Sequence, residues 1–347
     1  MQSGSPPITS THAADGSVAP ELRAALADAV ALYRGMVTLR LVSARMVALQ
    51  RDLRVAVHTS CLGEEAVIVG ATLAARPSDW VFPGTREWGA AILRGLPIAQ
   101  YMHHAFGSQA DLAKGHSAPD HPPARRFRVA AASGAAGAHL PHAVGVAWAA
   151  KIAKEDVAAV ALFGEAATSS GDFHNAVNFA GVFKPACVLV CRNDGRERFA
   201  TTRDRAIAYG VASAEVDGSD ALAVLTVVRA ALARGVEGKG ATLVEAVTKP
   251  VTAERADFPE TVWKGGGSEL LALGEADPIP RLRRALEREG LLDAAAHDAM
   301  LREIRVSIDA AVAEAERAGP PAPCTLFEDL YAGAPAPLHA AIPARHH

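Results

Sequence analysis

The chain has 347 residues and a formal net charge of −3; half of its residues are hydrophobic and 5% are aromatic. This length is enough for one large α/β domain or two smaller ones. The charge balance gives no basic patch for nucleic acid and no acidic tail. No apolar stretch reaches the roughly 20 residues that a membrane span requires, and the first residues lack the basic and apolar regions of a targeting signal. We therefore expect a cytoplasmic protein with neither nucleic acid nor membrane as a partner.

The four cysteines are scattered along the chain, and two of them, Cys187 and Cys191, fall in one apolar run. Such spacing is not typical of a zinc site or of a disulfide framework. The cysteines, which also include Cys61 and Cys324, are predicted to be reduced thiols of the core.

The first third of the chain is predicted to be helical, with loops. Residues 1–20 are rich in serine, proline, glycine and threonine, which is typical of a disordered tail. Apolar residues then recur at three- and four-residue steps from position 20 to 52, which predicts a helix. A second helix is expected over 63–75. Residues 79–82 lead into the loop PGTRE, and the prolines and glycines of 107–125 predict a long surface loop.

The middle of the chain alternates predicted strands with predicted helices. Continuous apolar runs over 157–163, 186–192 and 242–248 are typical of strands buried on both faces. Helical spacing separates them over 172–182 and 219–235. This rhythm predicts an α/β fold with a doubly wound, mostly parallel sheet flanked by helices. More helices follow residue 265, so we expect one domain over 21–318 and a proline-rich C-terminal extension over 319–347 that lies on a surface or a partner.

Polar residues follow two of the predicted strands at the point where each strand ends. GEAATSSGD (164–172) follows the first, and RNDG (192–195) follows the second. Ligands of an open parallel sheet bind beyond the carboxyl ends of the strands. Glu165 and Asp194 would supply hard oxygen ligands for Mg²⁺, and Arg192 would neutralise a phosphate. Acidic residues at strand ends are also common as helix caps or solvated turns, so this pattern alone leaves both interpretations open.

A family resemblance extends along nearly the whole chain after residue 30. GEAATSSGDFHNAVNFAG and the CRND after it resemble the thiamine-diphosphate motif of the alpha subunits of pyruvate, acetoin and branched-chain 2-oxo acid dehydrogenases. That motif runs from a G-D-G or G-E-G turn to an asparagine pair about 30 residues later. Other segments stand in the family's order, and some of them look closer to the branched-chain members. These segments are HTSCLGEEAVIVGA, FPGTREWG, HLPHAVGVAWAAK, EVDGSDALAV, DPIPRLRRALEREGLLD and LFEDLY.

The resemblance implies a thiamine-diphosphate-binding fold and an enzyme subunit. In such proteins, alpha and beta subunits form an α2β2 heterotetramer and hold thiamine diphosphate and Mg²⁺ between them. The enzyme decarboxylates a 2-oxo acid oxidatively and transfers the acyl group to a lipoyl-bearing acyltransferase core. By resemblance the metal ligands are Glu165, Asp194 (where Asn is usual) and the backbone carbonyl of Arg196. The residues expected to line the diphosphate are Arg86, Gly164, Ala166, Ala167 and Arg192.

Several positions depart from the family pattern. Ala253 and Glu254 stand where members of the family carry histidines, and alanine cannot transfer a proton. Losing a positioned acid–base group costs about 10²–10⁴ in rate. Ala166 places a methyl group where glycine is usual, and Thr85 replaces a tyrosine. The catalytic residues therefore stay unknown. A catalytically impaired or regulatory paralogue, or a carboligase or decarboxylase with another acceptor, remain alternatives.

Other polar residues are given structural interpretations. His174 at a predicted helix start is expected to cap or pack. His116 and Asp120, in the proline-rich loop, are expected to be solvated, although they could reach the mouth of a cofactor site. Glu64 and Glu65 are interpreted as first-turn acids that favour the helix dipole.

Overall fold

The computed structural model describes residues 26–131, 134–194, 202–248, 277–327 and 331–333, so the expected N-terminal tail lies outside the described residues. The described part contains a five-stranded parallel sheet in the order β1-β2-β3-β5-β4. The predicted α/β fold with a parallel sheet is confirmed. The strands are β1 (Trp80–Phe82), β2 (Ala159–Gly164), β3 (Cys187–Asn193), β4 (Ala212–Asp217) and β5 (Thr242–Val247).

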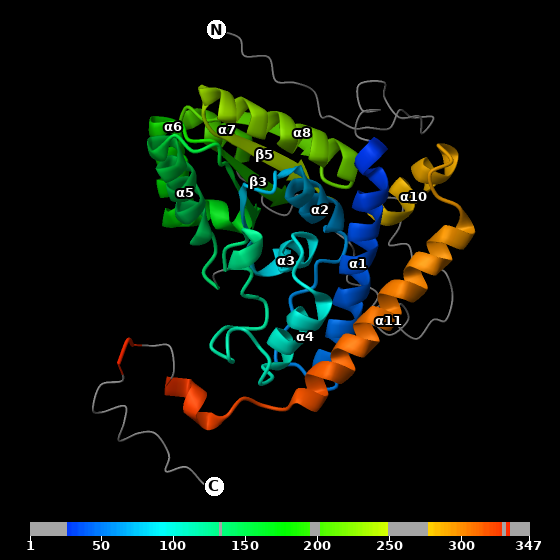
Figure 1. Ribbon diagram of the computed structural model, residues 1–347. Helices are drawn as coiled ribbons and strands as arrows, with labels where there is room; N and C mark the ends of the chain where they lie inside the picture. The colour runs from blue at the N-terminus through cyan, green and yellow to red at the C-terminus, as the bar shows by residue number, and fades with distance from the viewer. Residues whose placement is uncertain (1–25, 132–133, 195–201, 249–276, 328–330, 334–347) are drawn as a thin grey trace.

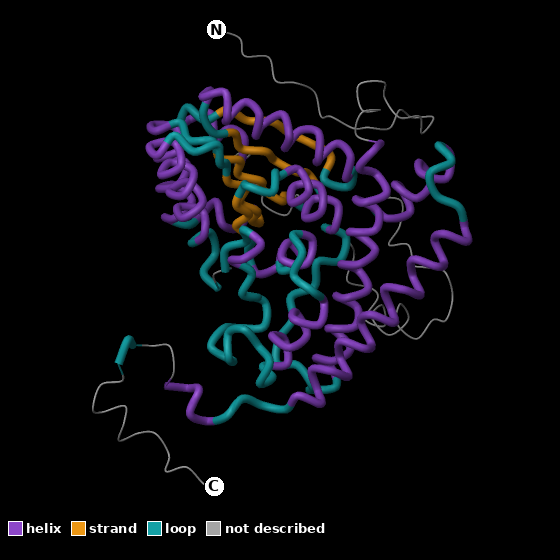
Figure 2. Tube along the Cα trace, in the orientation of Figure 1, coloured by secondary structure: helices purple, strands orange, loops and turns teal. Residues whose placement is uncertain are grey.

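Alternate side chains of the strands enter two separate cores, one on each face of the sheet. In β2, Val160 and Leu162 belong to the larger core, whereas Ala161 and Phe163 belong to the smaller one. Both faces are covered, because helices pack on each side (Figures 1 and 2). This arrangement explains why β2, β3 and β5 read as continuous apolar runs in the sequence.

The helices fall into two groups according to the core that they cover. α5 (His139–Ala153) and α6 (Gly171–Phe183) enclose the smaller core, and α7 (Thr202–Ala208) contributes to it. The remaining helices form or extend the larger core, with α1 at its centre and α11 running along the outside (Figure 1). They are α1 (Leu26–Arg51), α2 (Glu65–Ala74), α3 (Gly89–Leu93), α4 (Ile98–Phe106), α8 (Ala221–Arg234), α10 (Pro278–Arg288) and α11 (Ala294–Ala318).

Side-chain caps explain where several helices begin. Ser170 Oγ accepts a hydrogen bond from the backbone N–H of Phe173 and so begins α6 next to the end of β2. Aspartates cap α8, α10 and α11 in the same way, at Asp220, Asp277 and Asp293. Such caps satisfy backbone donors that have no partner within the helix.

The predicted loop over 107–125 is confirmed, but it is held in place at several points. His104 in α4 contacts both Asp111 Oδ1 (Nδ1, 2.9 Å) and the Ala118 carbonyl (Nε2, 2.9 Å). The segment after α11 contacts the same loop, since His116 Nε2 donates to the Thr325 carbonyl at 2.8 Å. The loop is therefore packed between α4 and the beginning of the C-terminal extension.

The structure also bears on the predictions for the cysteines and for membrane-spanning helices. Cys61, Cys187 and Cys191 are buried and free, as predicted, and Cys324 is half-buried and free. Within the described part of the chain, no helix combines the length and apolar character needed to cross a membrane.

Candidate functional site

The candidate site lies at the carboxyl ends of β2 and β3, which are neighbours in the sheet. Gly164, the last residue of β2, pairs in register with Arg192 of β3. Glu165 begins the short 3₁₀ turn Glu165–Ser169, and Asp194 directly follows β3. The parallel register therefore brings together the two carboxylates that are 29 positions apart in the sequence.

Glu165 and Asp194 interact through their side chains. Partial burial raises the pKa of Glu165, and the charge and hydrogen bond of Asp194 raise this pKa further, while Arg192 lowers it. Two carboxylates in this position favour either a shared proton or a cation between them. Mg²⁺ prefers oxygen ligands, and this pair supplies them, so these residues fit the Mg²⁺ that the sequence predicted.

Arg192 is buried beside this pair and is already paired with two carboxylates. Its Nη1 lies 2.6 Å from Glu64 Oε1, and its Nη2 lies 2.5 Å from Glu87 Oε1. Burial alone would lower the pKa of Arg192, but these two carboxylates outweigh it and raise the pKa. The predicted phosphate-binding arginine is thus present and charged, in an environment that also contains fixed anions.

Arg86 lies on the other side of Glu64 and is exposed. Its Nε is 3.4 Å from Glu64 Oε2, and its Nη1 donates to the Ser60 carbonyl at 3.2 Å. Arg86 and Arg192 therefore flank one carboxylate from two directions, and both guanidinium groups border the same cavity.

This cavity has a volume of about 230 Å³ and lies beyond the ends of β1 and β2. Of the predicted residues, Arg86, Gly164, Ala166, Ala167 and Arg192 line it, whereas Glu165 and Asp194 are not among the lining residues. Ala166 is exposed, so its methyl group borders open space. The other lining residues are Thr59, Gly84, Thr85, Glu87, Gly134, Ala135, Ala136, Gly137, His139 and Phe163.

Three predicted site residues cannot be located. Arg196, Ala253 and Glu254 lie outside the described residues, so the third metal ligand and the histidine positions stay predictions. Among the described residues, no group of three or more histidine, cysteine or acidic side chains is arranged to hold a metal. A metal bound here by Glu165 and Asp194 would need further ligands, such as phosphate oxygens.

One structural interpretation from the sequence is wrong, and two are refined. Asp120 is not solvated: it is 4% exposed, and its carboxylate accepts hydrogen bonds from the hydroxyl and backbone N–H of Thr59. Glu65 stands in the first turn of α2, as expected, but it is fully buried and paired with Arg40. Glu64 stands one residue before the first turn of α2, and its carboxylate pairs with Arg192. Side-chain partners that lie far away in the sequence decided all three cases.

The remaining interpretations hold or are refined. His174 is exposed and hydrogen-bonds the Tyr209 hydroxyl at 2.9 Å, so it packs at the start of α6. His116 is exposed, as expected, with a backbone partner in the C-terminal extension.

The sequence did not single out Glu87, Thr59 or His139 as part of this site. Glu87 directly follows the predicted Arg86 in the sequence, and this adjacency could have indicated that Glu87 belongs to the site. His139 Nε2 donates to the Leu162 carbonyl at 2.8 Å, and burial lowers the pKa of this histidine. Its position next to the cavity depends on the packing of α5 against β2, which no local pattern reveals.

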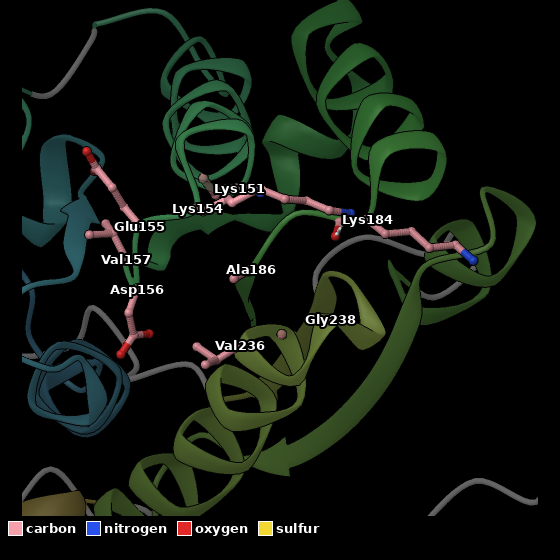
Figure 3. Close-up of a pocket in the computed structure, with 11 residues that line it drawn as sticks. Lys151, Lys154, Glu155, Asp156, Val157, Lys184, Ala186, Val236 and Gly238 are labelled. Atoms are coloured by element: carbon pink, nitrogen blue, oxygen red, sulfur yellow. Dashed lines mark hydrogen bonds between the residues drawn. The ribbon is translucent and has the colours of Figure 1, made fainter.

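A second cavity of about 330 Å³ lies at the opposite end of the sheet (Figure 3). Lys151, Lys154 and Lys184 border it, together with Glu155 and Asp156. The Lys151 amine donates to the carbonyls of Phe183 (2.7 Å) and Lys184 (3.1 Å), so it caps the end of α6. Asp156 is paired with Arg76. These groups serve the turns between elements, and the cavity is remote from the carboxylate pair.

The parallel sheet, flanked by helices and with its polar cluster at the strand ends, defines an open α/β ligand-binding fold. Among solved structures, a transketolase from Campylobacter jejuni aligns with 83% of this chain and 47% of its own, with a TM-score of 0.50 and 19% identity. This likeness concerns the fold alone.

Sequence comparisons identify the family. Residues 33–324 match the family model described as "Dehydrogenase E1 component". The 2-oxoisovalerate dehydrogenase subunit alpha of Bacillus subtilis is 33% identical over 316 residues, 88% of this chain and 96% of that protein. The 3-methyl-2-oxobutanoate dehydrogenase subunit alpha of Mycobacterium tuberculosis is 35% identical over 272 residues, 75% of this chain and 71% of that protein. The chain belongs to the dehydrogenase E1 component family, and the alpha-subunit resemblance inferred from its motifs is confirmed.

Proposed function

We propose that this chain is the alpha subunit of a branched-chain 2-oxo acid dehydrogenase and binds thiamine diphosphate and Mg²⁺ at the ends of β2 and β3. The observation that carries the proposal is the adjacency of Glu165 and Asp194, because a pair of interacting carboxylates beside Arg192 suits a cation with a diphosphate. Arg192 and Arg86 line one cavity next to this pair. The family membership over residues 33–324 supports the same assignment.

The substrate class follows from the relatives. The two bacterial relatives are named for 2-oxoisovalerate and 3-methyl-2-oxobutanoate, which are two names for one branched-chain 2-oxo acid. We therefore propose a branched-chain 2-oxo acid as substrate, a beta subunit as partner in an α2β2 assembly, and a lipoyl-bearing acyltransferase as acyl acceptor.

The residues of this chain would anchor and orient the cofactor. Glu165 and Asp194 would hold Mg²⁺, and Arg86 and Arg192 would pair with phosphate oxygens in the cavity. When bound, thiamine diphosphate supplies a nucleophilic carbon and an electron sink for decarboxylation. With alanine and glutamate at positions 253 and 254, the beta subunit or a residue of another segment would have to move the protons near the substrate.

The proposal is tested by binding and turnover in the assembled protein. The chain is co-expressed with the beta subunit from the same organism, and thiamine diphosphate is titrated with Mg²⁺ by calorimetry. Turnover is followed as dye reduction that depends on a branched-chain 2-oxo acid. Binding with turnover is the expected result. Binding without dye reduction would favour carboligation or another acceptor, and no binding would favour a non-catalytic paralogue.

The Glu165→Ala variant tests the metal site. Removing one of two carboxylate ligands should weaken Mg²⁺-dependent cofactor binding by at least about a hundred-fold. The thermal unfolding of the heteromer should change little, because Glu165 is only half-buried. Glu155→Ala, which removes an exposed carboxylate at the opposite end of the sheet, is the matched control. Normal cofactor binding by Glu165→Ala would mean that the metal assignment is wrong.

A further inference from the structure

We propose that Glu87 is a positioning residue, which together with Glu64 holds the Arg192 guanidinium in a fixed orientation at the edge of the cavity before any anion binds. This inference rests on the proposed diphosphate site and names the residues that prepare one of its arginines. Glu64, Glu87 and Arg192 are called the arginine clamp below.

The geometry of the arginine clamp fixes the guanidinium on two sides. Arg192 Nε donates to Glu87 Oε1 at 2.5 Å, Nη2 lies 2.5 Å from the same oxygen, and Nη1 lies 2.6 Å from Glu64 Oε1. A guanidinium has five N–H donors in a rigid planar fork. The clamp contacts that the structure describes occupy three of them and leave one N–H on each terminal nitrogen. The carboxylates of Glu64 and Glu87 therefore set the direction of these two remaining N–H groups.

Burial makes the clamp rigid. The side chains of Arg192 and Glu87 are 8% and 1% exposed, and that of Glu64 is 16% exposed. A buried arginine that lost its partners would leave a costly unpaired charge, so rotation away from Glu87 is unfavourable. The three residues come from the end of β3, the start of α2 and the turn Thr85–Glu87, so the clamp also joins three separate elements.

Gly84 provides the space for the Glu87 carboxylate. A Cβ atom on Gly84 would lie 2.6 Å from Glu87 Oε2, which is closer than such atoms approach. The backbone of Gly84 has φ −83° and ψ −173°, a conformation open to any residue. A methyl group on residue 84 would therefore force the clamp carboxylate to move, whereas the backbone conformation does not demand glycine.

The charges show that the clamp serves orientation. Arg86 and Arg192 contribute two positive charges, and Glu64 and Glu87 cancel both of them. A site that attracted a diphosphate by excess charge alone would be weakened by two such carboxylates. Ordering a free arginine at the moment of binding also lowers affinity, by up to about ten-fold per immobilised side chain. The clamp avoids the cost of ordering Arg192 at the moment of binding, while its carboxylates still weaken the electrostatic attraction of the site for a diphosphate.

The test uses the full chain assembled with its beta subunit, and the readout is calorimetric affinity for thiamine diphosphate with Mg²⁺. Glu87→Gln keeps an acceptor oxygen for Arg192 and removes a charge, so its affinity should equal or exceed that of the wild type. Glu87→Ala removes the same charge together with the anchor and should bind about ten-fold more weakly than Glu87→Gln. Gly84→Ala displaces the carboxylate without changing any charge and should bind more weakly than the wild type. Gly145→Ala, at an exposed glycine of α5 with open space around it, is the control.

The outcomes separate the clamp from the proposed function. Equal affinities of Glu87→Gln and Glu87→Ala, or wild-type affinity of Gly84→Ala, overturn the positioning role while leaving the cofactor site intact. Absence of binding by the wild type overturns the proposed function and the clamp with it. If Glu87→Ala does not fold, the contrast between Glu87→Gln and Gly84→Ala decides, since only Gly84→Ala is expected to lower the affinity.

Discussion

His58 lies next to the candidate site in a cluster of buried polar side chains. Its ring centroid is 5.1 Å from that of Trp88, and Nε2 lies 3.1 Å from Ser43 Oγ. Its Nδ1 has no hydrogen-bond partner among the described residues, and Asp120 Oδ1 lies 3.8 Å from it. Burial lowers the pKa of His58 to about 3, so the fold holds this histidine neutral.

The stability of the protein should therefore fall in acid. The unfolded chain takes up a proton at His58 near pH 6.5, whereas the folded chain does so only near pH 3. Stability from this residue is complete above pH 6.5 and is lost as the pH falls toward 3, by at most about 1.4 kcal/mol per pH unit. Urea unfolding followed by tryptophan fluorescence at a series of pH values measures it. His58→Gln should flatten the slope in this window; an unchanged slope would show that His58 titrates alike in both states.

At the scale of elements, a buried ion cluster joins α1, α2 and α10. Arg40 Nε lies 2.8 Å from Glu65 Oε1, and Arg40 Nη1 lies 2.7 Å from Asp277 Oδ2, with all three side chains fully buried. Burial raises the pKa of Glu65, and Arg40 opposes this effect. Because Asp277 also caps α10, the cluster fixes the start of that helix against α1.

Arg40→Met should destabilise the protein strongly, since it leaves two carboxylates buried without a cation. The expected loss is about 3–5 kcal/mol of unfolding free energy, measured by urea unfolding at neutral pH. Arg34→Met is the matched control: Arg34 lies in the same helix and pairs with Glu303, but both side chains are exposed. Its loss should be about 0–1 kcal/mol. Similar losses for the two variants would contradict the role given to the buried cluster.

The strands that could be predicted from the sequence differ in burial from those that could not. β2, β3 and β5 were predicted because both of their faces are covered, which leaves continuous apolar runs. β4 is an edge strand whose residues 212–215 are only half-buried, so no apolar run marks it. β1 has only three residues, Trp80–Phe82, and the sequence indicated only an approach to a loop. Strand length and edge position, which are properties of the assembled sheet, account for both omissions.

At the scale of the whole molecule, only some residues of the candidate site could be predicted from the sequence. Glu165 and Asp194 could be predicted together because neighbouring parallel strands bring their carboxyl ends to one edge. Glu64, Glu87 and Thr59 reach the same place from α2, the turn after β1 and the segment before α2. Their neighbours in space are remote in the chain, so no spacing rule applies to them. The family resemblance supplied Arg86 but gave no role to Glu87, which follows it.

The central claim is that Glu165 and Asp194 hold a single cation between the ends of β2 and β3. The most direct measurement is a crystal structure of the chain with its beta subunit, thiamine diphosphate and Mn²⁺, with the metal located by anomalous scattering. One anomalous peak within coordination distance of both carboxylates, and beside the diphosphate, is the predicted result. A metal bound elsewhere, or a diphosphate bound away from these strand ends, would contradict the account.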